Sequence, residues 1–116
     1  MQKLEIAVLP GDGIGHEIME GCLTLLDKVQ AKVGGYSLSY NHMRAGAEFY
    51  RETGIDITED DFKACGEADA ILFGAMGLPD VRFDDGTEIA PHLALRDAYG
   101  LYAGIRPVKA FPNTPI

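Results

Sequence analysis

The order of elements at the start of the chain most constrains its fold. An apolar run from Leu4 to Leu9 ends at Pro10, as a buried strand does, and Gly11, Gly13 and Gly15 follow it. Apolar residues then recur at helical spacing, at Ile18, Cys22, Leu25, Leu26, Val29 and Val33. The pattern predicts a strand, a tight glycine turn and a helix that packs this apolar stripe on a sheet and stops at Gly34.

The remaining elements continue this alternation. Residues 36–40 alternate apolar side chains with serine and predict a half-buried strand, and residues 70–73 predict a buried one. Helices are predicted over 44–53, from 58 to about 66, and over 91–99, with Pro91 at a first helical position and Gly100 ending the last. Strands that alternate with helices predict α/β layers with crossover connections.

An acidic run follows Thr58 and invites two interpretations. Glu59, Asp60 and Asp61 could be metal ligands, or they could occupy the first turn of a helix that Thr58 caps. The capping interpretation is favoured because the positive end of the helix dipole stabilises acids there, and it accounts for every residue in the run.

The glycine turn does not fit the dinucleotide-binding fingerprint. That motif needs a third glycine three positions after the second, and here those places hold His16 or Ile18. The second predicted strand also ends at Asn41-His42, without the acid that would bind a ribose. We therefore expect a backbone turn near a ligand in a fold other than the standard Rossmann fold.

Two arginines, Arg96 and Arg106, stand ten positions apart in the last predicted helix and in an extended segment after it. Planar guanidinium groups meet carboxylate oxygens two at a time, so two of them can hold one small dianion. Pro107 keeps Arg106 out of the helical region, which lets its side chain point back towards Arg96. The alternative is a solvated helix residue and a charge at a strand end.

Composition narrows the class of partner. The net charge is −8 in 116 residues, which disfavours binding to nucleic acid and to anionic membranes. The short apolar run near the start, closed by a proline, predicts neither a signal peptide nor a membrane span. Cys22 and Cys65 predict reduced structural thiols rather than a disulfide framework. We expect a soluble, cytoplasmic protein.

Two segments resemble the isocitrate/isopropylmalate dehydrogenase family, the metal- and NAD(P)-dependent β-decarboxylating dehydrogenases. Residues 7–18 resemble its opening strand and turn, and residues 95–109 resemble its substrate-arginine segment. The resemblance implies an α/β fold with a helix-sheet-helix layering. It also implies that residues 1–116 are the amino-terminal part of a larger domain, an expectation supported by the proline-rich, turn-like end at 111–116.

The resemblance also implies roles for particular residues. Arg96 and Arg106 would bind substrate, while Ile14 and the segment from Gly74 to Thr87 would face the nicotinamide side of NAD or NADP. The cofactor-facing residues are Ile14, Gly74, Ala75, Met76, Gly77 and Thr87. The ligands of Mg²⁺ or Mn²⁺ and the catalytic residues are expected beyond residue 116. Three acids of the loop, Asp80, Asp84 and Asp85, are left without a role.

By resemblance the reaction is oxidation of a 2-hydroxy acid with loss of its β-carboxylate. The substrate would be a hydroxy-dicarboxylate or tricarboxylate such as 3-isopropylmalate, isocitrate, tartrate or malate. The positions that distinguish these substrates hold Ile89, Ala90, His92 and Leu93, which match neither the isopropylmalate nor the isocitrate pattern. His92 is therefore a candidate to touch a polar substituent, against the alternative of a surface histidine.

Two functional hypotheses follow. The first is the enzyme or its amino-terminal portion, homodimeric as the full-length protein and inactive as 116 residues alone. The second is a non-catalytic truncated or regulatory module that pairs with a full-length subunit.

Overall fold

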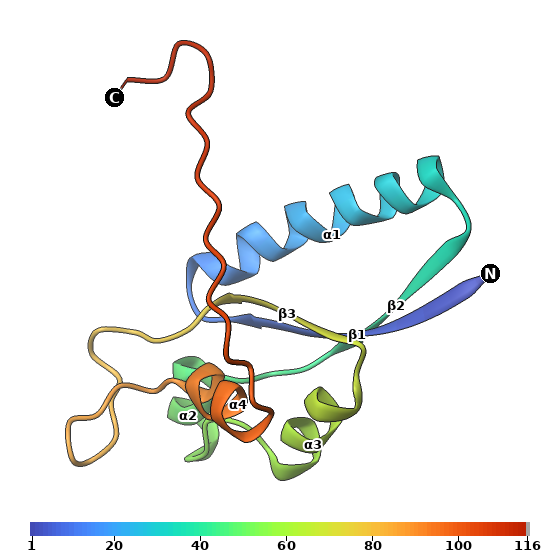
Figure 1. Ribbon diagram of the computed structural model, residues 1–116. Helices are drawn as coiled ribbons and strands as arrows, with labels where there is room; N and C mark the ends of the chain where they lie inside the picture. The colour runs from blue at the N-terminus through green and yellow to red at the C-terminus, as the bar shows by residue number, and fades with distance from the viewer. Residues whose placement is uncertain (116) are drawn as a thin grey trace.

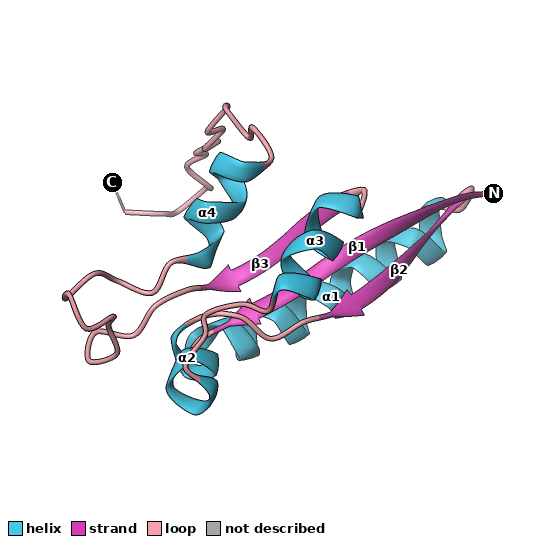
Figure 2. Cartoon of the chain, turned by 90° about the horizontal axis from the view of Figure 1, so that it is seen from below, coloured by secondary structure: helices cyan, strands magenta, loops and turns pink. Residues whose placement is uncertain are grey.

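Three parallel strands form the sheet of the computed structural model, which describes residues 1–115. The strands are β1 (Gln2–Gly11), β2 (Tyr36–His42) and β3 (Ala70–Ala75), in the order β2-β1-β3. The helices are α1 (Ile14–Val33), α2 (Ala47–Thr53), α3 (Glu59–Glu67) and α4 (Pro91–Ala98). Helix α1 covers one face of the sheet, and the other three helices lie on the opposite side (Figures 1 and 2). The predicted helix-sheet-helix layering is confirmed.

The centre of the core is β1. It pairs with β2 on one side, with Ile6 opposite Tyr40, and with β3 on the other, with Val8 opposite Leu72. Ala7, Val8 and Leu9 are fully buried because β1 has a neighbouring strand on both sides and helices on both faces. The core on the side of α3 and α4 consists of Ala7, Leu9, Met43, Ala45, Cys65 and Leu95.

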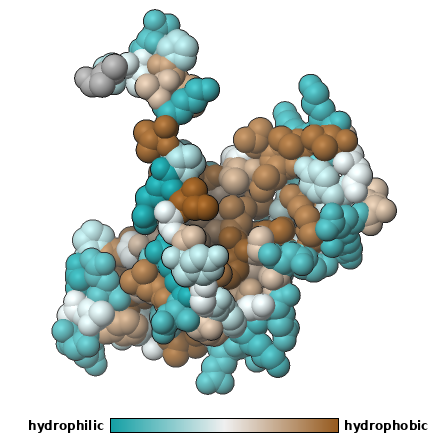
Figure 3. Space-filling model, in the orientation of Figure 1, coloured by the Kyte–Doolittle hydropathy of each residue, from teal (hydrophilic) through white to brown (hydrophobic). Residues whose placement is uncertain are grey.

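The apolar stripe predicted for α1 packs on the sheet only in part. Gly15 and Met19 are buried, and Cys22 and Leu26 are half-buried. Other members of the predicted stripe face outward: Ile18 is 50% exposed, Leu25 63%, Val29 41% and Val33 68%. Figure 3 shows apolar side chains gathered over this part of the molecule. The prediction was wrong for these residues because the stripe is wider than the surface that a three-stranded sheet covers.

Local sequence signals placed most helix ends correctly. The Thr58 hydroxyl accepts from the backbone N–H of Asp61 at 3.1 Å, and Pro91 is the first residue of α4, as predicted. Helix α2 begins later than predicted, at Ala47, because Gly46 is held at φ 118°. Strand β3 runs further than predicted, so that Gly74 and Ala75 belong to it, because Ala75 still pairs with Gly11 of β1.

Residues 100–115 leave the body of the molecule as an extended segment (Figure 1). The radius of gyration is accordingly 16.1 Å, against about 13 Å for a compact domain of this length. A turn closes the segment where Thr114 N–H donates to the Phe111 carbonyl at 3.1 Å, as predicted for this end, and Ile116 lies outside the described residues. Within residues 1–115 none of the helices has the length and apolar character needed to cross a membrane.

Candidate functional site

Asp12 joins three segments at the carboxyl ends of β1 and β3. Its side chain is 1% exposed, and three backbone N–H groups donate to its carboxylate. Ala47 and Gly77 donate to Oδ2 at 2.8 and 2.7 Å, and Glu48 donates to Oδ1 at 2.8 Å. The two carboxylate oxygens have enough lone pairs to accept from all three donors. The glycine turn, the start of α2 and the segment after β3 are thereby fixed to one another.

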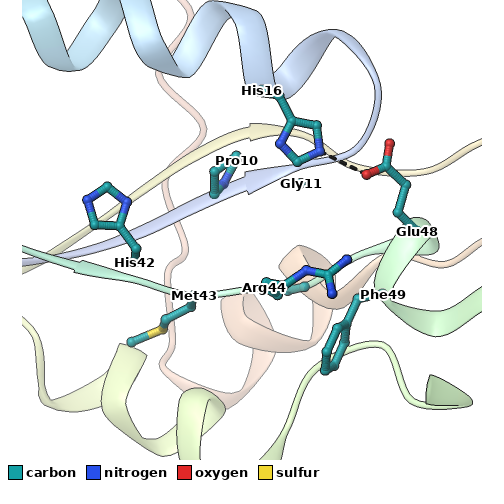
Figure 4. A pocket seen from close by; sticks show the side chains of 9 residues that line it. Pro10, Gly11, His16, His42, Met43, Arg44, Glu48 and Phe49 are labelled. Atoms are coloured by element: carbon teal, nitrogen blue, oxygen red, sulfur yellow. Dashed lines mark hydrogen bonds and ion pairs between the residues drawn. The ribbon is translucent and has the colours of Figure 1, made fainter. Parts of the chain in front are cut away.

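Glu48 of α2 makes a second set of hydrogen bonds to the glycine turn and the start of α1. Its Oε1 accepts from the N–H of Gly13 at 2.8 Å, and its Oε2 lies 2.8 Å from Nε2 of His16 in the first turn of α1. Figure 4 shows His16 and Glu48 facing each other across the end of β1. The Gly13 N–H, followed by His16, lowers the pKa of Glu48. Each of the two segments therefore supplies a carboxylate to the backbone of the other.

Glycines allow this close approach. A Cβ at Gly46 would lie 2.6 Å from Oδ2 of Asp12. A Cβ at Gly11 would collide with the Ala75 carbonyl, and one at Gly15 or Gly74 would collide with the Pro10 carbonyl. Gly11 and Gly15 are therefore required by backbone contact between β1, α1 and β3, and Gly13 by its positive φ in the turn.

The amides of the glycine turn are used within the protein. Gly13 N–H donates to Glu48, Gly15 N–H to the Asp12 carbonyl at 2.8 Å, and His16 N–H to the Gly13 carbonyl at 3.3 Å. A pyrophosphate would find these donors occupied and the Glu48 carboxylate beside them, so the turn does not fit the phosphate-binding mode of the dinucleotide fingerprint. Ile14, 60% exposed at the tip, fits an apolar contact with a flat ring instead.

The predicted cofactor-facing residues are brought together in part. Strand pairing places Gly74 and Ala75 beside the glycine turn, and the Gly77 bond to Asp12 holds the residues after β3 against that turn. Leu78 is the side chain nearest to a Cβ at Gly13, at 3.9 Å. Thr87 lies in a separate turn, where its carbonyl accepts from the N–H of Phe83 at 3.0 Å. Residues 74–77 thus lie beside the glycine turn that precedes Ile14, and Thr87 belongs to another part of the loop.

Arg96 and Arg106 line one hollow. It has a volume of about 440 Å³ and is walled by α4 and the start of the extended segment, with Arg96, Leu101, Tyr102, Ala103, Gly104, Ile105 and Arg106 around it. Helix α4 is anchored on α3, because the Tyr99 hydroxyl donates to the Phe62 carbonyl at 2.6 Å and the two rings lie 5.6 Å apart. Arg96 therefore projects from a fixed helix and Arg106 from an exposed segment.

His92, the third predicted substrate residue, lies against β3. Its ring stacks on Phe73, with 5.4 Å between centroids and 25° between planes. Its Nδ1 is buried and has no hydrogen-bond partner among the described residues. Burial, and then the charge of Arg96, lowers the pKa of His92. Its surroundings therefore favour the neutral imidazole, and the Nδ1 atom is enclosed by the protein.

Sequence reasoning missed Asp12, His16 and Glu48. The available signal was an acid between two glycines immediately after a buried strand, but its partners lie 35 to 65 positions further along the chain. His16 and Glu48 also border a second hollow of about 280 Å³, together with Pro10, Gly11, His42, Met43, Arg44, Ala45 and Phe49 (Figure 4). Within residues 1–115 no three His, Cys, Asp or Glu side chains converge on one point as the ligands of a metal ion would.

A three-stranded parallel sheet whose strand ends carry a glycine turn, followed by a hollow with two arginines, defines an α/β protein with a candidate site for a small dianion. Residues 5–115 match the family model described as isocitrate/isopropylmalate dehydrogenase. The chain belongs to this family.

Relatives support the assignment over nearly the whole chain. A 3-isopropylmalate dehydrogenase of Aquifex aeolicus is 41% identical over 115 residues, which cover 96% of this chain and 31% of that protein. A protein of Agrobacterium vitis named "probable tartrate dehydrogenase/decarboxylase" is 32% identical and is likewise covered over 31% of its length. The crystal structure of a β-decarboxylating dehydrogenase of Thermococcus kodakarensis, in its apo form, superposes with a TM-score of 0.67 at 33% identity, over 88% of this chain and 28% of that one. The chain thus spans about a third of the length of these relatives.

Proposed function

We propose that this chain is the amino-terminal part of an NAD(P)-dependent dehydrogenase that oxidises and decarboxylates a small 2-hydroxy acid. The observation that carries the proposal is the hollow lined by both Arg96 and Arg106 in a chain of this family. Two guanidinium groups in one hollow suit a substrate with at least two carboxylates.

The chain's own residues would bind and orient the substrate. Arg96, held by the anchored α4, would fix one carboxylate, and Arg106 would close over the substrate from the extended segment. Fixing both carboxylates restricts the substrate to one orientation relative to the cofactor, which contributes to the rate. Ile14 and residues 74–77 would lie beside the nicotinamide and exclude water from it.

NAD or NADP would supply the acceptor for the hydride on the carbon that bears the hydroxyl. The bond to the carboxylate β to the new ketone would then break, so that carbon dioxide leaves and the bonding electron pair forms an enolate that takes up a proton. The described residues offer no group of ligands for Mg²⁺ or Mn²⁺, and no step is assigned to a metal in this chain.

Tartrate, malate, isocitrate and 3-isopropylmalate are all candidate substrates, since each offers at least two carboxylates to the arginines. His92 gives no preference among them, because its ring stacks on Phe73 and it is not among the residues around the arginine hollow.

The test is cofactor reduction by the full polypeptide that contains this chain. NAD and NADP would each be offered with tartrate, malate, isocitrate and 3-isopropylmalate, in the presence of Mg²⁺ or Mn²⁺. Reduction with one hydroxy acid, accompanied by release of carbon dioxide, is the expected result. No reduction with any of them, together with co-purification of a longer family member, would instead support the non-catalytic module.

A further inference from the structure

The buried carboxylate of Asp12 connects two surfaces that the proposed function assigns to the cofactor. One is the glycine turn that ends in Ile14, and the other is the segment after β3 that contains Gly77. The backbone also links them, since Asp12 N–H donates to the Ala75 carbonyl at 2.6 Å. Asp12 thus both donates to the end of β3 and accepts from the residue two positions beyond it.

We infer that Asp12 is a positioning residue for cofactor binding, which holds the Ile14 turn and the Gly77 segment in register so that both meet the same nicotinamide. This inference rests on the proposed function. Its physical basis is the number of donors on one carboxylate, because three backbone N–H groups from two other segments lose an acceptor when Asp12 changes.

The binding of Asp12 to α2 makes the arrangement rigid. The carboxylate accepts from the first two N–H groups of α2, which have no acceptors within the helix. Asp12 therefore caps α2, although it is distant from that helix in the sequence. Glu48 of the same helix accepts from Gly13 in return. The turn therefore cannot shift relative to Gly77 without breaking bonds in both directions.

The arginine hollow is anchored independently. Helix α4 is fixed by Tyr99 on α3. A loss of the Asp12 contacts should therefore weaken cofactor binding without a comparable effect on substrate binding. A residue that served only the stability of the fold would affect both affinities together or neither.

The decisive variant is Asp12→Asn in the full polypeptide. An asparagine oxygen can replace Oδ2 and serve Ala47 and Gly77, and its NH₂ group then opposes the Glu48 N–H. If the oxygen replaces Oδ1 instead, the NH₂ group opposes both Ala47 and Gly77. The dissociation constant of NAD or NADP, measured by calorimetry, should rise about tenfold or more, the scale of one charge-assisted hydrogen bond. The dissociation constant of the hydroxy acid should change by less than about twofold, well below the scale of one hydrogen bond.

Asp69→Asn is the matched control. Asp69 also has a carboxylate that accepts a backbone N–H, that of Glu5 at 2.8 Å, and joins β1 to the turn before β3, but at the opposite end of the sheet. This variant should leave cofactor affinity unchanged. If Asp12→Asn fails to fold, Glu48→Gln serves instead, because it weakens the reciprocal contact between α2 and the Gly13 turn while keeping the size of the side chain.

Unchanged cofactor affinity in Asp12→Asn, or an equal loss of cofactor and substrate affinity, would overturn the inference. Amide hydrogen exchange gives a second readout: exchange at Gly77 should accelerate in Asp12→Asn and stay unchanged in Asp69→Asn. If the unaltered protein bound neither NAD nor NADP, the proposed function itself would fail, and the exchange result would still decide whether Asp12 couples the two segments.

Discussion

The same substitution, glycine to alanine, should have opposite effects at two helical positions. At Gly21 in α1 an added Cβ meets nothing within 4 Å. At Gly66 in α3 it would collide with the ring of Tyr99. Gly21→Ala should therefore stabilise the chain, and Gly66→Ala should destabilise it and loosen the helix that carries Arg96.

The contacts of Tyr99 set the size of the effect. Gly66→Ala would displace the Tyr99 ring and break the 2.6 Å hydrogen bond from its hydroxyl to the Phe62 carbonyl. The loss of this bond lowers the free energy of unfolding by about 1 kcal/mol. Loss of the ring pair with Phe62 adds about 1 kcal/mol. The higher helix propensity of alanine offsets about 0.5 kcal/mol of this loss, because Gly66 lies near the end of α3. The net loss is therefore about 1.5 kcal/mol, whereas Gly21→Ala should gain up to about 1 kcal/mol from propensity alone.

Urea denaturation of the full polypeptide that contains this chain, followed by far-ultraviolet circular dichroism, measures both effects. The midpoint should fall for Gly66→Ala and rise for Gly21→Ala, with unchanged slopes. Tyr99→Phe separates the contributions, because it removes only the hydroxyl and should cost about 1 kcal/mol. A Gly66→Ala variant as stable as the original chain would show that Tyr99 does not anchor α4 in this way.

Two pH-dependent predictions follow from burial. The pKa of His92 is lowered in the folded chain, so the contribution of His92 to stability is complete above the unfolded pKa of about 6.5 and is lost as the pH falls below that value. The drop in urea midpoint between neutral and mildly acidic pH should therefore be smaller in His92→Gln. An equal drop in both proteins would contradict the burial of His92. Burial, and then the hydrogen bond to Asp27, raises the pKa of Tyr40 to about 12, so one tyrosine should ionise late in an ultraviolet titration. In Asp27→Asn it should ionise at lower pH; an unchanged titration would exclude the Asp27 contact as a cause.

The order of elements could be predicted because it is encoded locally. Thr58 caps α3 through a bond that spans three residues, and Pro91 starts α4 by its own ring geometry. The exposed side of α1 could not be predicted, because the periodicity of Leu25 and Val33 shows that they share a stripe but not how much of it the sheet covers. The later start of α2 also could not be predicted, because the sequence does not show that Gly46 adopts a positive φ.

The candidate site was predictable where the family motif supplies it and not where distant segments meet. The motif pointed to Arg96 and Arg106, and they line one hollow. Asp12 appeared only as part of a glycine turn, since its role depends on N–H groups of Ala47 and Gly77 that the fold brings to it. His92 was predicted from its position before Arg96, whereas its stacking on Phe73 depends on how α4 packs against β3.

The most direct test of the proposed arginine site is kcat/KM for the hydroxy acid in Arg106→Ala of the full polypeptide, with Arg51→Ala as the control. Arg51 is an exposed arginine on α2, away from the hollow. Loss of one charge-assisted bond to a carboxylate should lower kcat/KM about 100-fold in Arg106→Ala, and the control should keep its activity. Near-normal kcat/KM in Arg106→Ala would contradict the assignment of this hollow as the substrate site.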